Sequence, residues 1–208
     1  MSTVLHIQAA NRSLLSYSLR ATQTFLKAYQ ETHPRDVIKT VDVWDAGLPP
    51  FDPVAVAGKY RLLHGQKLDD RETETWRRVE AVIAEFKAAD KYVFSSPMWN
   101  FGIPYRLKQY FDLIVQPGYT FSYSPSTGYK GLVTGKPAVL VLARGGEYRE
   151  GTAAYDMQRP YLELILNFMG ITDIQTILIE PTLMRGVDPA EDSLAAAGAT
   201  AWEMAKTF

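Results

Sequence analysis

Residues 92–104 of this chain read YVFSSPMWNFGIP, and this stretch decides the fold. Tyr92-Val93-Phe94 is typical of a buried strand. Two prolines and a glycine then exclude a regular helix or strand from residues 97–104, so a stiff loop is expected there. This loop exposes large apolar side chains at the carboxyl end of a strand, which is the edge where open α/β sheets bind ligands. The stretch therefore predicts a site for a planar ligand.

Strand-like apolar runs alternate with helical periodicity along the rest of the chain. Strands are expected at 4–7, 36–43, 91–95, 138–143 and 174–179, and helices at about 18–31, from Asp69 or Asp70 through Phe86, after Pro104, at 155–169 and at 189–208. Residues 119–123 and 129–133 predict a hairpin insertion, and 44–58, rich in proline and glycine, predicts a long loop. The alternation predicts one domain, residues 1–208, with helices on both faces of a five-stranded parallel sheet. The order 2-1-3-4-5, as in flavodoxin-like folds, is expected.

The composition narrows the classes of function. The chain has 208 residues and a formal net charge of -1, which argues against nucleic acid or an anionic membrane as the main partner. No cysteine is present, so thiolate chemistry and disulfides are excluded, and the three histidines lack metal-ligand spacing, so no metal is expected. No signal peptide or membrane span is evident, and a cytoplasmic protein is expected.

Three segments after predicted strands carry candidate ligand-binding residues. After the first strand, Arg12, Ser16 and Ser18 flank Tyr17 at a helix start, where hydroxyls and backbone N–H groups suit a phosphate. The second segment is the aromatic loop, with Pro97, Met98, Trp99, Asn100 and Phe101. The third is Arg144-Gly145-Gly146, whose glycines let the backbone approach a ligand closely.

In the expected strand order these three segments converge on one crevice. A phosphate site, an aromatic wall and a glycine-lined wall together are what flavin mononucleotide (FMN) requires. A G-x-G-x-x-G fingerprint is absent from the first turn, which argues against a dinucleotide site of the Rossmann type.

The chain resembles the FMN-dependent NADH-azoreductases, which are similar to the wider group of flavodoxin-like NAD(P)H quinone reductases. The resemblance covers nearly the whole chain in order. Its motifs are Ser16-x-Ser18, Pro97-Met98-Trp99-Asn100-Phe101-x-Ile103-Pro104, Leu107-Lys108-x-x-x-Asp112, Gly118-x-Thr120-Phe121-x-Tyr123, Gly128-x-x-Gly131-Leu132, Gly135-Lys136, Arg144-Gly145-Gly146 and Tyr161-Leu162 through Phe168-x-Gly170-Ile171.

The resemblance implies a homodimer with an FMN in each of two interface sites. It implies that NADH or NADPH reduces the flavin and that a quinone or azo compound then takes two electrons by a ping-pong route. It also implies that Tyr123 and Phe168 line the substrate face of the flavin, and Tyr148 is a further candidate for the ring edge. Two residues depart from the family pattern: Ala10 stands where a serine is usual, and Trp99 where a tyrosine is usual.

Two other classes of function are also compatible with the sequence. A flavodoxin-type electron carrier without a substrate of its own would use the same fold and loops, although such carriers are commonly strongly acidic and this chain is balanced. A binding or sensor protein that has lost catalysis is the other alternative, and only Ala10 favours it.

Overall fold

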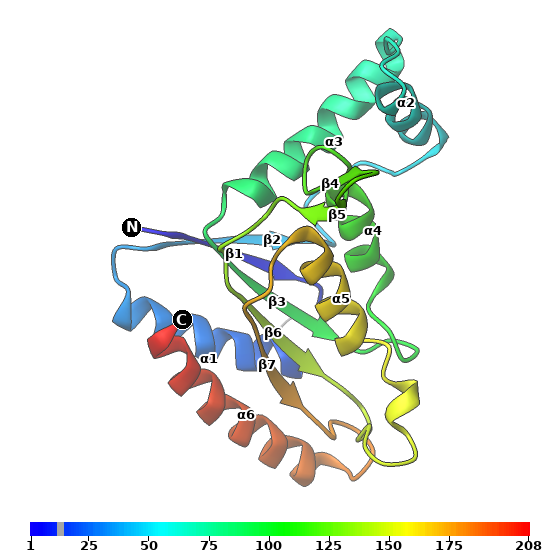
Figure 1. Ribbon diagram of the computed structural model, residues 1–208. Helices are drawn as coiled ribbons and strands as arrows, with labels where there is room; N and C mark the ends of the chain where they lie inside the picture. The colour runs from blue at the N-terminus through cyan, green and yellow to red at the C-terminus, as the bar shows by residue number, and fades with distance from the viewer. Residues whose placement is uncertain (12–14) are drawn as a thin grey trace.

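The computed structural model of the protein describes residues 1–11 and 15–208 (Figure 1). The elements follow one another as β1 (Thr3–Gln8), α1 (Tyr17–Thr32), β2 (Val37–Asp42), α2 (Pro53–Leu63), α3 (Asp70–Ala88), β3 (Lys91–Pro97), α4 (Tyr105–Ile114), β4 (Phe121–Ser124), β5 (Gly128–Gly131), β6 (Ala138–Ala143), the 3-10 turn η2 (Ala153–Tyr155), α5 (Arg159–Met169), β7 (Ile174–Ile179) and α6 (Val187–Thr207).

The central sheet has five parallel strands in the order β2-β1-β3-β6-β7. Counted among the core strands alone, this is the predicted order 2-1-3-4-5, and the fold prediction is confirmed. β6 is buried along its whole length, whereas half of the residues of the edge strand β2 are exposed. A strand covered on both faces must be apolar throughout, which is why β6 was readable from its sequence alone.

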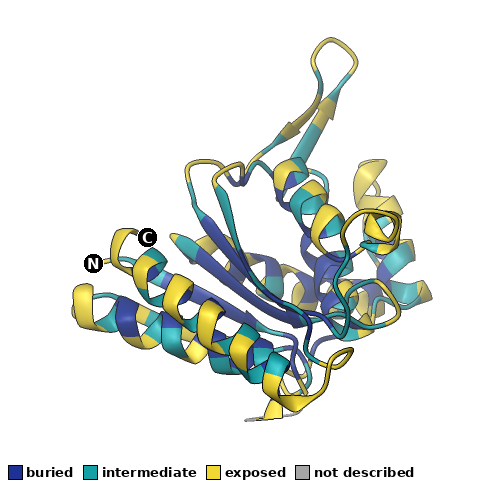
Figure 2. Ribbon diagram, turned by 90° about the horizontal axis from the view of Figure 1, so that it is seen from below, coloured by how far each residue is buried: buried dark blue, intermediate teal, exposed yellow. Residues whose placement is uncertain are grey.

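Helices cover both faces of this sheet, and Figure 2 shows the buried strands between helices with exposed outer sides. On one face, α1 and α6 pack through residues such as Phe25 and Ala201 against Val93 and Val139. On the other face, α3, α4 and α5 contribute Val79, Leu107 and Leu162 to a larger core. Because both faces are covered by helices, a ligand must enter at a strand edge.

The prediction of a long loop over 44–58 holds for residues 44–52 but was wrong for the rest, because α2 begins at Pro53. Proline is tolerated in the first turn of a helix, where its missing N–H would have no intrahelical partner, and the Asp52 side chain accepts from the N–H groups of Val54 and Ala55. Gly58 lies within α2, where a Cβ would contact the Glu72 side chain of α3 at 3.7 Å. Here glycine permits close helix packing instead of marking a loop.

The predicted hairpin is formed by β4 and β5, which pair antiparallel. It follows α4, which runs back from the carboxyl ends of the strands, so the hairpin lies at the amino-terminal edge of the sheet (Figure 1). Its base rests on the end of α5, where a Cβ on Gly131 would stand 2.3 Å from the Gly170 nitrogen. Gly170 itself has a φ of 102°, a left-handed conformation that ends α5 and favours glycine. Two glycines thus bring two backbones into direct contact.

In the described residues, 1–11 and 15–208, no helix has the length and apolar character needed to cross a membrane.

Candidate functional site

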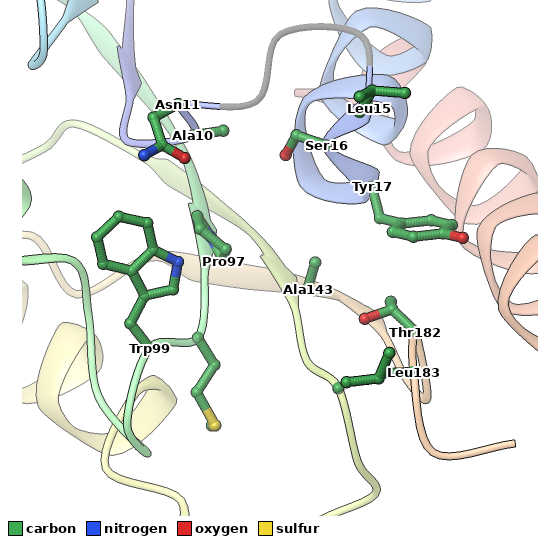
Figure 3. A pocket seen from close by; sticks show the side chains of 12 residues that line it. Ala10, Asn11, Leu15, Ser16, Tyr17, Pro97, Trp99, Ala143, Thr182 and Leu183 are labelled. Carbon is green, nitrogen blue, oxygen red and sulfur yellow. The ribbon is translucent and has the colours of Figure 1, made fainter. Parts of the chain in front are cut away.

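A cavity of about 240 Å³ lies at the carboxyl edge of the sheet (Figure 3). Four segments that are far apart in sequence form its walls. Its lining residues are Ala10, Asn11, Leu15, Ser16, Tyr17, Pro97, Met98, Trp99, Ala143, Gly145, Thr182 and Leu183. The predicted convergence of the loops that follow the first, third and fourth core strands is therefore observed.

The start of α1 forms the first wall. Ser16 is the N-cap, and its hydroxyl accepts from the Leu19 N–H at 3.4 Å and lies 3.1 Å from the hydroxyl of Ser18. Ser18 is fully buried and does not line the cavity, whereas Ser16 and Tyr17 do. The first N–H groups of a helix have no intrahelical partner, so this end can receive an anion. The predicted ligand Arg12 lies outside the described residues.

The loop after β3 forms the second wall through Pro97, Met98 and Trp99. Asn100 and Phe101 have φ values of 47° and 69°, and Trp99 and Gly102 exchange two backbone hydrogen bonds of 2.9 Å around them. Asn100 and Phe101 are the two central residues of this tight turn, so their N–H groups take no part in the hydrogen bonds between Trp99 and Gly102. Neither residue lines the cavity itself.

Trp99 is held from behind by a second tryptophan. The Trp44 ring lies 5.5 Å from the Trp99 ring, and its indole N–H donates to the Ala9 carbonyl at 3.0 Å. Trp44 comes from the segment after β2, which sequence reasoning took as loop. The larger ring at position 99 thus has its own packing partner in this chain.

The segment after β6 forms the third wall with Gly145, and the segment after β7 closes it. The N–H groups of Leu183 and Met184 both donate to the Gly145 carbonyl, at 3.0 and 2.8 Å. A Cβ on Gly146 would stand 3.2 Å from the Met184 side chain, so Gly146 packs against this segment and not into the cavity.

Sequence reasoning missed the contributions of Asn11, Leu15, Thr182 and Leu183. The strand order could have predicted Thr182 and Leu183. They follow the fifth core strand, which neighbours the fourth, so their loop had to reach the same edge. Asn11 and Leu15 carry no motif of their own.

Arg144 does not line the cavity. Its side chain is 2% exposed and lies behind the wall, 2.7 Å from Asp156 and 3.4 Å from Glu180. Tyr148 lies over the Arg144 guanidinium at 5.8 Å and meets the Phe101 ring edge to face at 6.4 Å. The structure therefore brings Tyr148 beside the aromatic loop, at the rim of the site.

Tyr123 and Phe168 are not near this cavity within one chain. They belong to an aromatic cluster with Phe121 and Tyr129, built by the hairpin and the end of α5. The cluster lies at the opposite edge of the sheet, and Tyr123 is 60% exposed. Tyr123 and Phe168 can therefore reach a cavity of this kind only in another copy of the chain.

The sheet just before the aromatic loop holds a buried histidine. His6, in β1, has a ring nitrogen 2.8 Å from the hydroxyl of Ser95, two residues before Pro97. Burial lowers the pKa of His6 from 6.5 to about 4, so the imidazole is neutral at physiological pH. It holds strand β3 to β1 without carrying a charge.

Curated relatives match the chain over its full length. It is 47% identical to the FMN-dependent NADH:quinone oxidoreductase of Nitratidesulfovibrio vulgaris (strain DP4), with all of both chains covered. It is 36% identical to FMN-dependent NADH:quinone oxidoreductase 3 of Pseudomonas fluorescens, with 99% of this chain and 97% of that one covered.

Solved structures and a family pattern agree with these relatives. The azoreductase AzrA superposes with a TM-score of 0.93 at 33% identity, covering all of both chains. An FMN-dependent NADH-azoreductase from Bacillus anthracis str. Ames Ancestor, solved in complex with FMN, superposes with a TM-score of 0.88 at 28% identity over 100% of this chain and 99% of that one. Residues 2–204 match a protein family whose description is "flavodoxin-like fold". The chain belongs to this flavodoxin-like family, among the FMN-dependent NADH:quinone oxidoreductases and azoreductases.

Proposed function

We propose that the chain, as one FMN-binding domain, is an oxidoreductase that transfers two electrons from NADH to quinones and azo compounds. The observation that carries the proposal is the cavity itself. It joins a helix N-terminus, an aromatic loop and a glycine-containing wall at the carboxyl edge of the sheet. The names of the full-length relatives support the same reaction.

The residues around the cavity fit the two ends of FMN. The Ser16 hydroxyl and the first N–H groups of α1 would hold the phosphate. Pro97, Met98 and Trp99 would line the ring on one side, and Gly145 leaves room for its edge. A cavity of about 240 Å³ is smaller than the roughly 300–1,000 Å³ of sites that enclose a ligand. The cavity would therefore not enclose FMN completely, and a second reactant could meet the exposed part of the ring.

FMN, when bound, would supply the electron chemistry, accepting two electrons from NADH and passing them to the oxidant. The protein would hold the two flat reactants in turn at the exposed part of the ring. The backbone N–H of Gly145, in the cavity wall, would donate to the polar ring edge, where it would stabilise added negative charge. The N–H groups of Asn100, Phe101 and Gly146 lie just outside this lining and would do the same only if the ring edge extends beyond the cavity. No carboxylate, histidine or lysine occurs among the described residues that line the cavity, so we infer that solvent supplies the proton for the product.

The active unit would be a homodimer. Tyr123 and Tyr129 are 60% and 66% exposed on a hairpin that projects from the body of the chain (Figure 2). Exposed aromatic side chains of this kind are typical of an interaction surface. A second copy would bury this cluster and bring Tyr123 and Phe168 over the exposed part of the partner's ring. This arrangement gives both residues the substrate-lining role that the resemblance implies.

Steady-state kinetics with purified, FMN-loaded protein test the proposal. NADH oxidation should require both FMN and a quinone, and double-reciprocal plots at several quinone concentrations should be parallel, because the nicotinamide leaves before the quinone binds. Sedimentation velocity should give a dimer. Protein that binds FMN but does not oxidise NADH with any quinone would contradict the proposed reaction.

A further inference from the structure

Arg144 is a buried cation with partners on two other segments. Its Nη1 donates to Glu180 at 3.4 Å, and its Nε donates to Gln158 at 3.2 Å. Asp156 lies 2.7 Å from Nη2 and forms an ion pair with it. The acid side chains are only 14% and 12% exposed. A buried charge is strongly destabilising without its partners, so the positions of Arg144, Asp156, Gln158 and Glu180 are coupled.

Arg144 lies at the end of β6, and hydrogen bonds connect it to the ends of β3 and β7, which also line the cavity. Gln158, itself buried, donates its amide to the Ser96 carbonyl at 3.2 Å, directly before Pro97. The backbone carbonyl of Arg144 accepts from the N–H and the hydroxyl of Thr182, at 2.8 and 2.9 Å. The ends of β3, β6 and β7 are thus joined by one polar network behind the cavity wall.

The network also sets where α5 begins. Asp156 uses one carboxylate oxygen for Arg144 and the other for the N–H groups of Gln158 and Arg159, at 3.0 and 3.1 Å. The helix therefore starts at Arg159 instead of near Tyr155, where sequence periodicity predicts it.

We propose that Arg144 is a positioning residue, which acts through Glu180, Asp156 and Gln158 to fix the spacing of the cavity walls without touching the ligand. This inference rests on the proposed function, since FMN is the ligand. It differs from the role suggested by the sequence, in which Arg144 contacts the cofactor.

The two roles predict opposite effects of the acidic partners. If Arg144 attracted the FMN phosphate directly, removing the nearby negative charge of Glu180 would strengthen binding of this anion. If Arg144 positions the walls, removing Glu180 disturbs the same network and weakens binding. Riboflavin, which lacks the phosphate, separates the roles again, because wall spacing affects both ligands and a phosphate contact affects FMN alone.

The test measures dissociation constants for FMN and riboflavin by flavin fluorescence in Arg144→Lys, Arg144→Met and Glu180→Gln. We expect Arg144→Met and Glu180→Gln each to weaken both ligands by about tenfold, with Arg144→Lys in between. The matched control is the exposed pair of Arg20 and Glu191, joined by two 2.8 Å hydrogen bonds; Arg20→Met and Glu191→Gln should leave both constants within about twofold. Unchanged or tighter FMN binding in Glu180→Gln would overturn the inference.

A second readout needs no cofactor. In the apoprotein, Glu180→Gln should speed amide hydrogen exchange in 144–148, 156–159 and 181–184 together, because all three segments share the network. Unchanged exchange there overturns the inference even if a variant binds FMN poorly. Wild-type protein that binds no FMN would instead overturn the proposed function, and the exchange result would still decide the role of Arg144.

Discussion

The carboxyl edge of the sheet and the β4–β5 hairpin at the opposite edge both combine aromatic residues with glycines, but with different results. At the carboxyl edge Trp99 and Gly145 surround a cavity within one chain. At the hairpin Gly131 and Gly170 bring two backbones together, and Tyr123 and Tyr129 face outward. One edge therefore forms a cavity within a single chain, whereas the other displays aromatic rings to solvent, where we propose that a second copy of the chain covers them.

The largest expected effect is the loss of stability when the backbone contact at the base of the hairpin is disrupted. In Gly131→Ala the new Cβ would stand 2.3 Å from the Gly170 nitrogen and 2.5 Å from its Cα, and backbone cannot move aside cheaply. We expect a loss of about 3 kcal/mol in the free energy of unfolding, measured by denaturant titration. The control Gly198→Ala lies within α6, with nothing within 4 Å of its Cβ, and should stabilise the protein by about 1 kcal/mol. Equal, small effects of both substitutions would contradict the close backbone contact.

The second effect concerns the sheet between the two edges. The folded-state pKa of His6 is about 4, below its ordinary 6.5, so the unfolded chain binds the proton more tightly. Stability is therefore complete above pH 6.5 and falls as the pH drops to 4, by about 3 kcal/mol in total. His6→Asn should remove this part of the pH dependence, whereas substitution of the exposed His64 by Asn should retain it. Unfolding titrations with the same slope for wild type and His6→Asn would refute the assignment.

The third effect sharpens the role of the carboxyl edge. Ser16→Ala removes one phosphate-facing hydroxyl and should weaken FMN binding by about tenfold, while riboflavin binding stays nearly constant. Asp52→Ala also deletes an N-cap, at a similar cost of about 1 kcal/mol in stability, but on α2, outside the lining of the cavity. Isothermal titration should therefore show unchanged FMN binding for Asp52→Ala. If Ser16→Ala weakened riboflavin binding as much as FMN binding, the Ser16 hydroxyl would not contact the phosphate.

The smallest effect tests whether the hairpin serves a site at all. Tyr123→Ala should raise the KM for a quinone by roughly fivefold, because an aromatic contact to the substrate is lost, while the FMN dissociation constant stays the same. Tyr60→Ala removes a tyrosine of similar exposure on α2 and should change neither value. If Tyr123→Ala weakens FMN and quinone binding equally, its assigned role is wrong.

The sequence was sufficient for the sheet and for three of the four segments that form the cavity, since both follow from local pattern and strand order. The apolar run 138–143 coincides with β6, and the loop after it reached the expected edge. The helix α2 was missed because Pro53 and Gly58 suggest a loop, and only the Asp52 cap and the contact with α3 make them compatible with a helix.

Long-range relations were the part that local pattern could not supply. The Arg144 network joins residues 96, 144, 156, 158 and 180, and no spacing rule brings them together. Likewise, the periodicity of residues 119–133 predicts a hairpin but not the edge at which its aromatic residues gather. Such relations depend on packing between elements and become visible only in the folded chain.

We propose that the carboxyl-edge cavity holds FMN, through which electrons pass from NADH to a quinone. An anaerobic titration of FMN-loaded protein with NADH, followed in the visible flavin spectrum, tests it most directly. We expect the flavin absorbance to be bleached with one equivalent of NADH per site and to return when a quinone is added. Flavin that stays oxidised in excess NADH, in protein saturated with FMN, would show that this chain does not carry out the reaction.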